Sequence, residues 1–570
     1  MHRTIAFLLL QILVYQLSGQ NSFSFHPPLD IPMVLSGNFG ELRADHFHSG
    51  IDIKTNGTTG HPVYSIEEGY VSRIKVQANG YGKSIYIDHP GGYTSLYGHL
   101  DSYRDDIATF VRKMQYRHRS HAIDLYLEPG QFKIGKGDII AYSGNTGGSS
   151  GPHLHFEIRT SGNQHPTNVL KYGFDIADHV APRFYSLWLY PGGEASQVNR
   201  AADKQRFPVV RDNGVYKVPY GTRLRAGGKL GVGVEVFDYL SGAGNRCGVY
   251  ILEMSVDGRK VYSHTMDEFD FSDTRYVNAH VDYEELISSD KKVHRLYRLP
   301  NDRLKIYGEL VDNGWITVGE NKKYQVRITA VDVAGNSSSL EFEITGDTAT
   351  REVLPAVPDQ ATPMRWNEKN SFQSDEIKVD IPANALYQDI QFTCDKLPGE
   401  PGMLSDLYRI HSPGTPVHLP YTVSINYELQ DPRLKEKLLL VTFNEDHDLV
   451  GAGGDYRDGA VVADLRNFGL FAVAADTTRP EIILQSGIDQ ADLSGTKEIR
   501  FTIRDNLSDI EDYQGYLDNQ WALFEYDPKN DLLTYTFDKD RIQSGTLHDL
   551  ELYVSDGKGN VNLYHTTFTW

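Results

Sequence analysis

The stretch Gly144–Arg159, GNTGGSSGPHLHFEIR, joins a loop rich in glycine and serine to a short run of alternating residues. His153 and His155 stand two positions apart where the alternation begins. Residues i and i+2 of a strand point to the same face, so the pattern predicts that both imidazoles enter one site. Such a pair suits metal binding or proton transfer. On its own it is more often a surface or core feature, because a zinc site needs further ligands.

The composition of the 570-residue chain indicates several globular domains with much β structure. It is 40% hydrophobic and 23% charged, an ordinary globular mixture. The length is too great for one core, and about three to five domains are expected. The 35 tyrosines and the many short alternating runs favour strands. The net charge of -20 argues against a nucleic-acid partner, because phosphate contacts need clustered lysine and arginine.

The N-terminus has the pattern of an export signal. His2 and Arg3 precede an apolar run from Ile5 to Tyr15, and small residues follow it. This order predicts a secretory signal peptide over residues 1–19. The run is too short to span a bilayer comfortably, so we expect no transmembrane segment. An exported protein with a periplasmic, cell-envelope or extracellular location is therefore expected.

Candidates for the missing ligands lie upstream of the opening stretch. His48 and Asp52 are four positions apart in a run, His48 to Ile53, that reads as a strand. Even spacing places both side chains on one face, and Gly50 between them would leave that face open for an ion. Imidazole and carboxylate are both zinc ligands. Taken alone, an exposed His–Asp pair remains the simpler interpretation.

Together these stretches resemble the lysostaphin-type M23 zinc endopeptidases, which are LytM-like peptidoglycan hydrolases. The resemblance covers about residues 35 to 170 and is carried, in order, by His48-x-x-x-Asp52, Tyr97-Gly-His99-Leu and Gly-Pro-His153-Leu-His155-Phe-Glu. It implies that His48, Asp52 and His155 bind Zn²⁺. It also implies that His99 and His153 are catalytic histidines beside the zinc-bound water. Two histidines and one carboxylate leave a fourth tetrahedral position open, which is typical of a catalytic zinc site.

The expected chemistry follows from that donor set. Zinc lowers the pKa of its water to roughly 7 and polarises the scissile carbonyl. His99 and His153 would take the water's proton, steady the oxyanion and protonate the leaving amine, with the division of these roles left open. The resemblance implies a secreted zinc-dependent endopeptidase that hydrolyses the peptide cross-links of bacterial peptidoglycan through a zinc-activated water.

The other features of this region carry secondary expectations. Residues 103–121 are expected to be partly helical, and the excursion from 104 to 130 reads as an insertion that would line the substrate groove. Its His118 and His121 are expected on a solvated face. The glycine-rich loop is expected to shape the rim of the cleft. Supporting or surface roles are expected for four more histidines: His46, His61, His89 and His165.

The whole chain is expected to be mainly β: a lysostaphin-type antiparallel β catalytic domain followed by immunoglobulin-like β-sandwich modules. The predicted boundaries are 30–175 for the peptidase domain, 183–346 for a first sandwich with an acidic insertion at about 265–315, 360–475 for a β module of uncertain type, and 478–570 for a second sandwich. The two sandwiches share alternating strands that end in Asp-x-x-Gly-Asn turns, which we interpret as ordinary turns and not as calcium sites. Cys247 and Cys394 are expected to be free thiols.

Two other functions stay open. One is a catalytically silent M23-fold regulator, or cell-wall-binding protein, that activates another hydrolase. Inactive relatives usually lose a ligand, whereas all five positions are present here. The other is a surface adhesin or glycan binder with a trimming enzyme attached. The cross-link that is cut, the origin of the wall and the oligomeric state are not indicated by the sequence.

Overall fold

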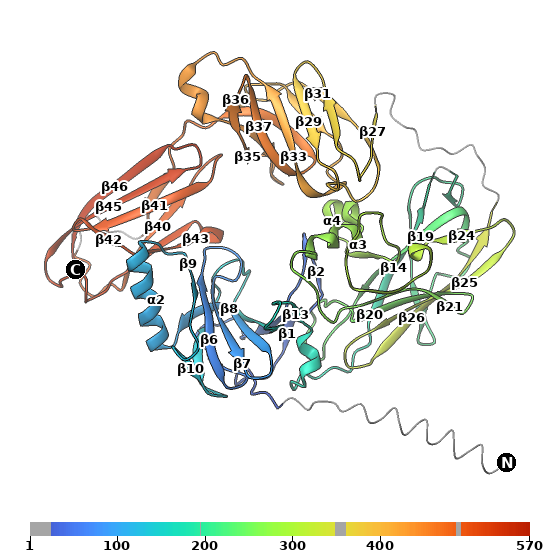
Figure 1. Cartoon of the computed structure of the whole chain (residues 1–570), viewed down its shortest axis with the longest axis horizontal. Coiled ribbons are helices and arrows are strands. Elements are labelled where there is room, and N and C mark those ends of the chain that lie inside the picture. Colours follow the sequence, from blue (N-terminus) through green and yellow to red (C-terminus); the bar gives the residue numbers. More distant parts are fainter. Residues whose placement is uncertain (1–23, 194, 348–360, 486–491) are drawn as a thin grey trace, which may run out of the picture.

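The computed structural model describes residues 24–193, 195–347, 361–485 and 492–570. The signal peptide predicted over residues 1–19 lies outside them. The fold is mainly β, as predicted, and its sheets form four modules that follow one another around an arc (Figure 1). We call these the N-terminal (24–182), second (183–347), third (361–476) and C-terminal (477–570) modules. Within the described residues, no helix is both long and apolar enough to cross a membrane.

One antiparallel sheet builds the N-terminal module, along the path β1-β4-β12-β8-β7-β6-β10. Four further strands pair at its margins. The bounds are β1 Leu35–Gly37, β4 Ile51–Lys54, β5 Pro62–Tyr64, β6 Gly69–Val76, β7 Lys83–His89, β8 Tyr93–Tyr103, β9 Ile123–Tyr126, β10 Lys133–Ile134, β11 Ile139–Ser143, β12 His153–Thr160 and β13 Pro166–Thr167. Helix α2 (Asp105–His118) follows β8, where partly helical structure was expected.

The alternation of β12 separates the core from the candidate site. Leu154, Phe156 and Ile158 pack into the hydrophobic core of the module. Successive side chains of a strand point to opposite faces, so His153 and His155 face away from that core. The same period places Ile51 and Ile53 of β4 in the core and Asp52 opposite. Because β12 pairs with β4 in the register His155↔Asp52, the two polar side chains become direct neighbours.

The strand expected from His48 to Ile53 begins only at Ile51, and His48 lies in the loop before it. The loop follows the short hairpin of β2 (Leu42–Arg43) and β3 (His46–Phe47). A Cβ on Gly50 would lie 2.3 Å from the carbonyl oxygen of Phe156. The glycine therefore permits close approach of the loop to β12. It does not serve to leave a face open for an ion.

The second module contains a long segment that packs against the N-terminal module. Its main strands are β14 (Arg183–Pro191), β19 (Arg225–Phe237), β20 (Ile251–Val256), β21 (Arg259–Thr265), β25 (Lys323–Val331) and β26 (Ser337–Gly346). Between β21 and β25 come α3 (Val277–His280), α4 (Tyr283–Ser289) and β22 (Val293–Arg295), in the predicted acidic insertion. Phe47 packs in one cluster with residues of this segment, and its amide donates to Thr274 Oγ1 at 3.0 Å.

The third and C-terminal modules each consist of paired sheets around a core. In the third module the sheets are β28 (Asn370–Gln373), β29 (Ile377–Ile381), β33 (Pro416–Asn426), β37 (Ala460–Asn467) and β36 (Asp455–Arg457), facing β31 (Cys394–Leu397), β32 (Leu407–Ile410), β38 (Gly469–Ala475), β34 (Leu438–Phe443) and β35 (Leu449–Gly453). In the C-terminal module they are β39 (Glu481–Leu484), β40 (Glu498–Arg504), β44 (Leu532–Thr536) and β43 (Phe524–Asp527), facing β42 (Gln520–Ala522), β41 (Ile510–Leu517), β45 (Leu547–Asp556) and β46 (Val561–Thr569). Cys247 and Cys394 are free, as expected.

The second and C-terminal modules repeat one junction. In the second module, Asn336 Nδ2 donates to Asp332 Oδ2 at 2.8 Å and to the Asp178 carbonyl at 3.4 Å. In the C-terminal module, Asn560 Nδ2 donates to Asp556 Oδ2 at 2.7 Å and to the Asp476 carbonyl at 3.1 Å. Each turn thus ties the last hairpin of its module to the segment that enters it. The sequence echo between the two modules therefore corresponds to a repeated structural element.

The C-terminal module returns to the N-terminal module and packs against α2 (Figure 1). Tyr116 and Trp521 meet edge to face with centroids 5.3 Å apart, and Lys83 Nζ lies 2.8 Å from Glu525 Oε2. The excursion that was expected to line the groove instead forms this interface. His118 is exposed, but His121 is buried opposite Tyr513, so the expectation of a solvated face is wrong for His121.

A change of pH tests the interface. Burial lowers the pKa of His121 to about 4, whereas an unfolded histidine titrates near 6.5. The neutral ring therefore stabilises the folded protein above pH 6.5, and this contribution is lost as the pH falls from 6.5 towards 4, because the unfolded chain binds one more proton. We expect His121→Gln to reduce the pH dependence of the unfolding free energy by up to about 1.4 kcal/mol per pH unit in this window.

Calorimetric unfolding of both proteins across this window measures the difference. His118→Gln, at an exposed position of the same segment, is the matched control and should follow the parent protein. If the unfolding free energies of His121→Gln and of the parent protein changed with pH in the same way, the buried and neutral state assigned to His121 would be contradicted.

Candidate active site

The three candidate metal ligands meet at one point. His48 Nε2 lies 3.1 Å from Asp52 Oδ1 and 3.1 Å from His155 Nδ1, and His155 Nδ1 lies 2.9 Å from Asp52 Oδ1. All three residues are buried. Two imidazoles and a carboxylate are a donor set that Zn²⁺ takes in catalytic sites. The structure therefore brings together the residues that the sequence singled out, although His48 comes from a loop and not from a strand.

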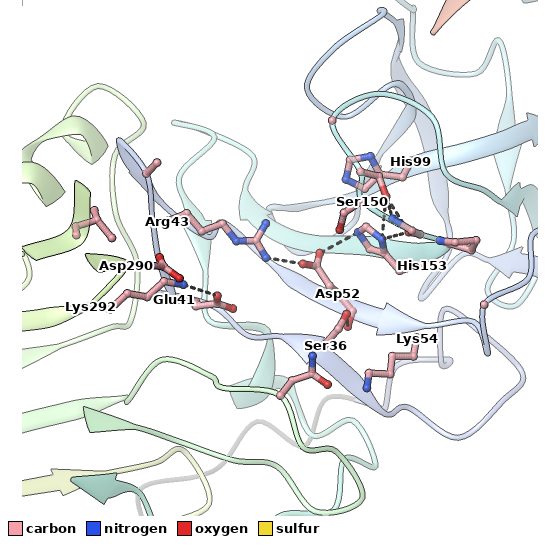
Figure 2. A pocket seen from close by; sticks show the side chains of 18 of the residues that line it. Ser36, Glu41, Arg43, Asp52, Lys54, His99, Ser150, His153, Asp290 and Lys292 are labelled. Carbon is pink, nitrogen blue, oxygen red and sulfur yellow. Dashed lines mark hydrogen bonds and ion pairs between the residues drawn. The ribbon is translucent and has the colours of Figure 1, made fainter. Parts of the chain in front are cut away.

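His99 and His153 stand beside this cluster (Figure 2). His153 Nε2 lies 3.4 Å from Asp52 Oδ1, and the His99 and His153 ring centroids are 4.7 Å apart. His99 lies within β8, not at its end as expected, and its φ is 57°. This left-handed residue coincides with a shift in the pairing of β7 with β8, between Lys83↔Leu100 and Ile85↔Tyr97. Strain of this kind is concentrated at functional sites.

Each of the four imidazoles has one nitrogen committed to an acceptor, at 2.8 Å in every case. The pairs are His48 Nδ1 with the Asn38 carbonyl, His155 Nε2 with Glu157 Oε1, His99 Nδ1 with the Thr146 carbonyl and His153 Nδ1 with the Gly151 carbonyl. A carbonyl oxygen can only accept, so the facing nitrogen carries the proton. The opposite nitrogens are thus free to offer lone pairs to a metal or a substrate proton, and outer partners of this kind orient metal-binding histidines.

Glu157 is the most heavily bonded of these partners. Its Oε1 accepts from Ser49 Oγ at 2.7 Å and from Tyr81 Oη at 2.6 Å, and Oε2 accepts from Arg159 Nε at 2.6 Å. Burial opposes the charge on Glu157, but Arg159 and His155 outweigh it and hold the pKa of this carboxyl below its usual range. Glu157 follows His155 at i+2 on β12, so the same-face spacing signalled its role in the sequence.

Arg43 is a second residue that sequence reasoning missed. Its Nη2 donates to Asp52 Oδ2 at 2.6 Å, which leaves Oδ1 to face the histidines. A Cβ on Gly37 would lie 2.9 Å from this Nη2 and 3.0 Å from Asp52 Oδ2, so a larger residue there would shift these two side-chain ends. Only the proximity of the glycine-rich Gly37–Gly40 segment to Arg43 marked it in the sequence, and proximity alone does not identify a partner.

The electrostatics of the cluster keep Asp52 ionised. Burial opposes its charge, but His48 and hydrogen bonds from His153 and His155 hold the pKa of Asp52 well below its usual range. Although burial disfavours a charged His155, Asp52 and Glu157 raise its pKa to about 9. Burial and the neighbouring His155 and His153 lower the pKa of His99 to about 3. Without a metal ion, the cluster of ligands therefore carries its positive charge as a proton on His155. A bound cation would replace that proton.

The cleft over the cluster is a cavity of about 1310 Å³ with walls from three modules. Gly148–Pro152 form one rim, as expected for the glycine-rich loop. The opposite wall contains Leu286–Asp290 and Lys292 of the second module, and Glu445 of the third module reaches the edge. Lys292 Nζ lies 3.3 Å from Glu41 Oε1 across this wall (Figure 2). Of the described residues that line the cleft, none comes from the 104–130 excursion, which corrects that expectation.

The four histidines for which supporting or surface roles were expected have other partners. His46 contacts the Ala44 carbonyl, His61 contacts Thr58 Oγ1, His89 lies between the Glu68 carbonyl and Ser95 Oγ, and His165 lies 3.4 Å from Asp270. Their contacts agree with the supporting or surface roles expected for them.

The C-terminal module holds the loop that orients His99. Lys529 Nζ donates to the carbonyl of Asn145 and, at 3.2 Å, to that of Gly147. These residues flank Thr146, whose carbonyl accepts from His99. Lys529, which lies 384 residues beyond Asn145 in the sequence, thus fixes the backbone beneath one of the candidate catalytic histidines.

Glu157→Gln tests the support of the cluster. The amide keeps the shape but removes the charge that orients His155, and it leaves Arg159 buried without its partner. We expect zinc affinity to fall about 10- to 100-fold, because outer-partner changes have effects of this size. We also expect a loss of stability of about 3–5 kcal/mol, typical of one partner removed from a buried ion pair.

Zinc competition with a chromogenic chelator and chemical denaturation measure the two effects. Glu68→Gln, the same substitution at an exposed position, serves as the control. Unchanged zinc affinity in folded Glu157→Gln would show that the carboxylate has no role in the site.

Two segments of the chain match known families. Residues 46–168 match peptidase family M23, and residues 361–476 match a Zu5-like domain. The latter corresponds to the β unit whose type the sequence left uncertain.

Curated relatives match over the N-terminal part of the chain. The DD-carboxypeptidase/endopeptidase Mpg of Neisseria meningitidis is 30% identical over 121 residues, which is 21% of this chain and 22% of the relative. Peptidoglycan DD-endopeptidase ShyA of Vibrio cholerae is 27% identical over 188 residues, 32% of this chain and 37% of the relative. The chain thus spans between about a fifth and two-fifths of the length of these relatives.

A zinc-containing peptidase from Vibrio cholerae, known from its crystal structure, is 26% identical, with coverage of 26% of this chain and 39% of that chain and a TM-score of 0.19. The motifs and the family match agree on one segment of the chain. Residues 46–168 are thus the part of the chain that is similar to peptidase family M23.

Proposed function

We propose that the protein is an exported, zinc-dependent endopeptidase that hydrolyses peptide cross-links of peptidoglycan. One observation carries the proposal: His48 Nε2, Asp52 Oδ1 and His155 Nδ1 lie within 3.1 Å of one another, and the remaining ring nitrogens of both histidines are already committed. Once a metal displaces the proton of His155, two imidazole lone pairs and the ionised carboxylate converge on one point. This donor chemistry fits Zn²⁺ better than Ca²⁺ or Mg²⁺, which prefer oxygen ligands.

His48, Asp52 and His155 would hold the zinc. Bound there, Zn²⁺ supplies Lewis acidity towards a carbonyl oxygen and a water molecule. The chain itself supplies orientation, because Arg43 fixes one oxygen of Asp52 and Glu157 fixes the ring of His155. Burial of the three ligands keeps competing water away from the donor atoms.

His99 and His153 would handle the protons of hydrolysis. Each donates one N–H to a loop carbonyl, which leaves Nε2 turned away from that carbonyl and able to accept or pass a proton. Both residues line the cleft beside Asp52, so a peptide lying there can meet both rings. Accepting a proton from water, bonding the developing oxyanion and protonating the leaving amine are tasks suited to such a pair.

The substrate and location rest on the relatives and on the cleft. The Vibrio relative is named as a peptidoglycan DD-endopeptidase and the Neisseria relative as a DD-carboxypeptidase/endopeptidase. The cleft carries charges of both signs, since Arg43, Lys54 and Lys292 line it together with Glu41 and Asp290. Such a lining suits a peptide that bears both carboxylates and amines, as cell-wall cross-links do. The apolar N-terminal run supports export to the compartment where that substrate lies.

Two substitutions separate metal binding from proton handling. His155→Ala removes a ligand, and we expect loss of both bound zinc and hydrolysis. His153→Gln keeps the ligands, and we expect native zinc content with kcat lower by about 10²- to 10⁴-fold, the usual contribution of a general acid–base. Zinc analysis and mass spectrometry of muropeptides released from purified sacculi measure the two quantities.

His61→Gln, at a half-buried histidine outside the cluster, is the matched control. Zinc-loaded protein that releases no muropeptide from any sacculus would contradict the enzyme and favour the silent regulator. Cleavage that persists after chelation would contradict the metal mechanism.

A further inference from the structure

A second histidine cluster lies in the second module, outside the peptidase domain. His264 lies on β21 next to its last residue, His280 is the last residue of α3, and His294 lies on β22. Exposed fractions of their surfaces are 0%, 0% and 3%. Three imidazoles from three separate elements are thus gathered in the interior, where polar groups are normally paired.

The three rings approach within ligand distance of one another. Each offers one nitrogen, and these nitrogens all lie within 4.8 Å of one another. His280 Nε2 lies 3.0 Å from His294 Nδ1, and the His264 ring centroid is 4.9 Å from that of His280. Three nitrogens at such separations can surround a single ion, because zinc–imidazole bonds are about 2.0–2.1 Å long.

Tyrosine hydroxyls occupy the outer nitrogens of two rings. Tyr262 Oη lies 2.9 Å from His264 Nδ1, and Tyr307 Oη lies 3.2 Å from His280 Nδ1. Tyr307 donates its own proton to Asp302 Oδ2, so it can only accept from His280. Nδ1 of His280 therefore carries the proton, and its Nε2 presents a lone pair to the centre of the cluster. Orientation of this kind from outside is typical of metal-binding histidines.

Hydrogen bonding alone does not satisfy the cluster. His280 and His294 pair with each other, and His264 Nε2 is then buried without a partner among the described residues. A buried nitrogen without a hydrogen-bond partner is rare in native interiors and points to a bound ion or water at the centre of the cluster. Burial also lowers the pKa of all three histidines, that of His294 to about 4, so the rings are neutral at physiological pH. Neutral imidazole is the form that binds metal.

We propose that His264, His280 and His294 form a second metal site, which takes a divalent transition cation, with Zn²⁺ foremost. Three neutral imidazoles select such an ion over Ca²⁺ and Mg²⁺, which need oxygen ligands. The burial of all three residues points to a structural role, since a substrate has no access to the ion.

The site would stabilise the wall of the peptidase cleft. It joins β21 to α3 and β22, the elements that flank α4 and the cleft-lining residues Leu286–Asp290. The His280 ring also lies 6.1 Å, centroid to centroid, from the ring of Phe47, the neighbour of His48 in sequence. A metal ion in the second module would therefore order the surface against which the segment that carries His48 packs.

Metal stoichiometry tests this proposal separately from the proposed peptidase function. In the double variant His48→Ala/His155→Ala of the full mature chain, the active-site ligands are removed and the second cluster is untouched. After zinc loading and gel filtration, we expect about two zinc ions per native chain and about one per double variant. Addition of His264→Gln should reduce the count to about zero, whereas addition of His118→Gln, at an exposed position, should leave it at one.

A zinc-free double variant would overturn the proposal, and this result does not depend on whether His264→Gln folds. Cobalt(II) added to the double variant provides a second readout. Visible absorption of a tetrahedral nitrogen-bound ion, together with a higher unfolding temperature, is expected. Absence of both the absorption and the shift would equally overturn the site.

Discussion

The site depends on one buried carboxylate held among three imidazoles and a guanidinium. Removing the charge of Asp52 from water is expensive, and the cost is offset only where partners surround it. The register of β4 with β12 sets His155 directly opposite Asp52, and the loop before β4 brings His48 to the same oxygen. Core packing of Ile51, Ile53 and the alternate residues of β12 fixes that register. The apolar face therefore determines the geometry of the polar face.

The site is also a product of several modules. The second module packs on the segment that carries His48 and supplies the far wall of the cleft, and the C-terminal module bonds the loop beneath His99. These contacts distinguish the chain from a catalytic domain joined to passive spacers. Access to the cleft and the orientation of two of its histidines depend on modules that carry none of the five motif residues.

The local sequence identified the residues of the site better than it predicted the backbone geometry and the walls of the cleft around them. The five motif residues lie together in the structure, as their spacing predicted. The reason is that β12 has the expected same-face periodicity and that the motifs, taken in their order along the chain, converge on one site. The positions of His48 and His99 differed from expectation, since a close approach at Gly50 and a left-handed residue at His99 are set by neighbouring strands. Arg43 carried no periodic signal, whereas Glu157 did. Leu286–Asp290 lie over 100 residues beyond the last motif, and His121 is buried by a distant module, so no local pattern marked either.

Anomalous diffraction at the zinc absorption edge, from crystals of the protein grown with zinc, would locate the ion relative to the five histidine and aspartate side chains of the site. The proposed zinc site requires a strong peak about 2.0–2.2 Å from His48 Nε2, Asp52 Oδ1 and His155 Nδ1, with His99 and His153 on its open side. A zinc-free cluster in such crystals, with His155 bonded to Asp52 where the ion should lie, would contradict it.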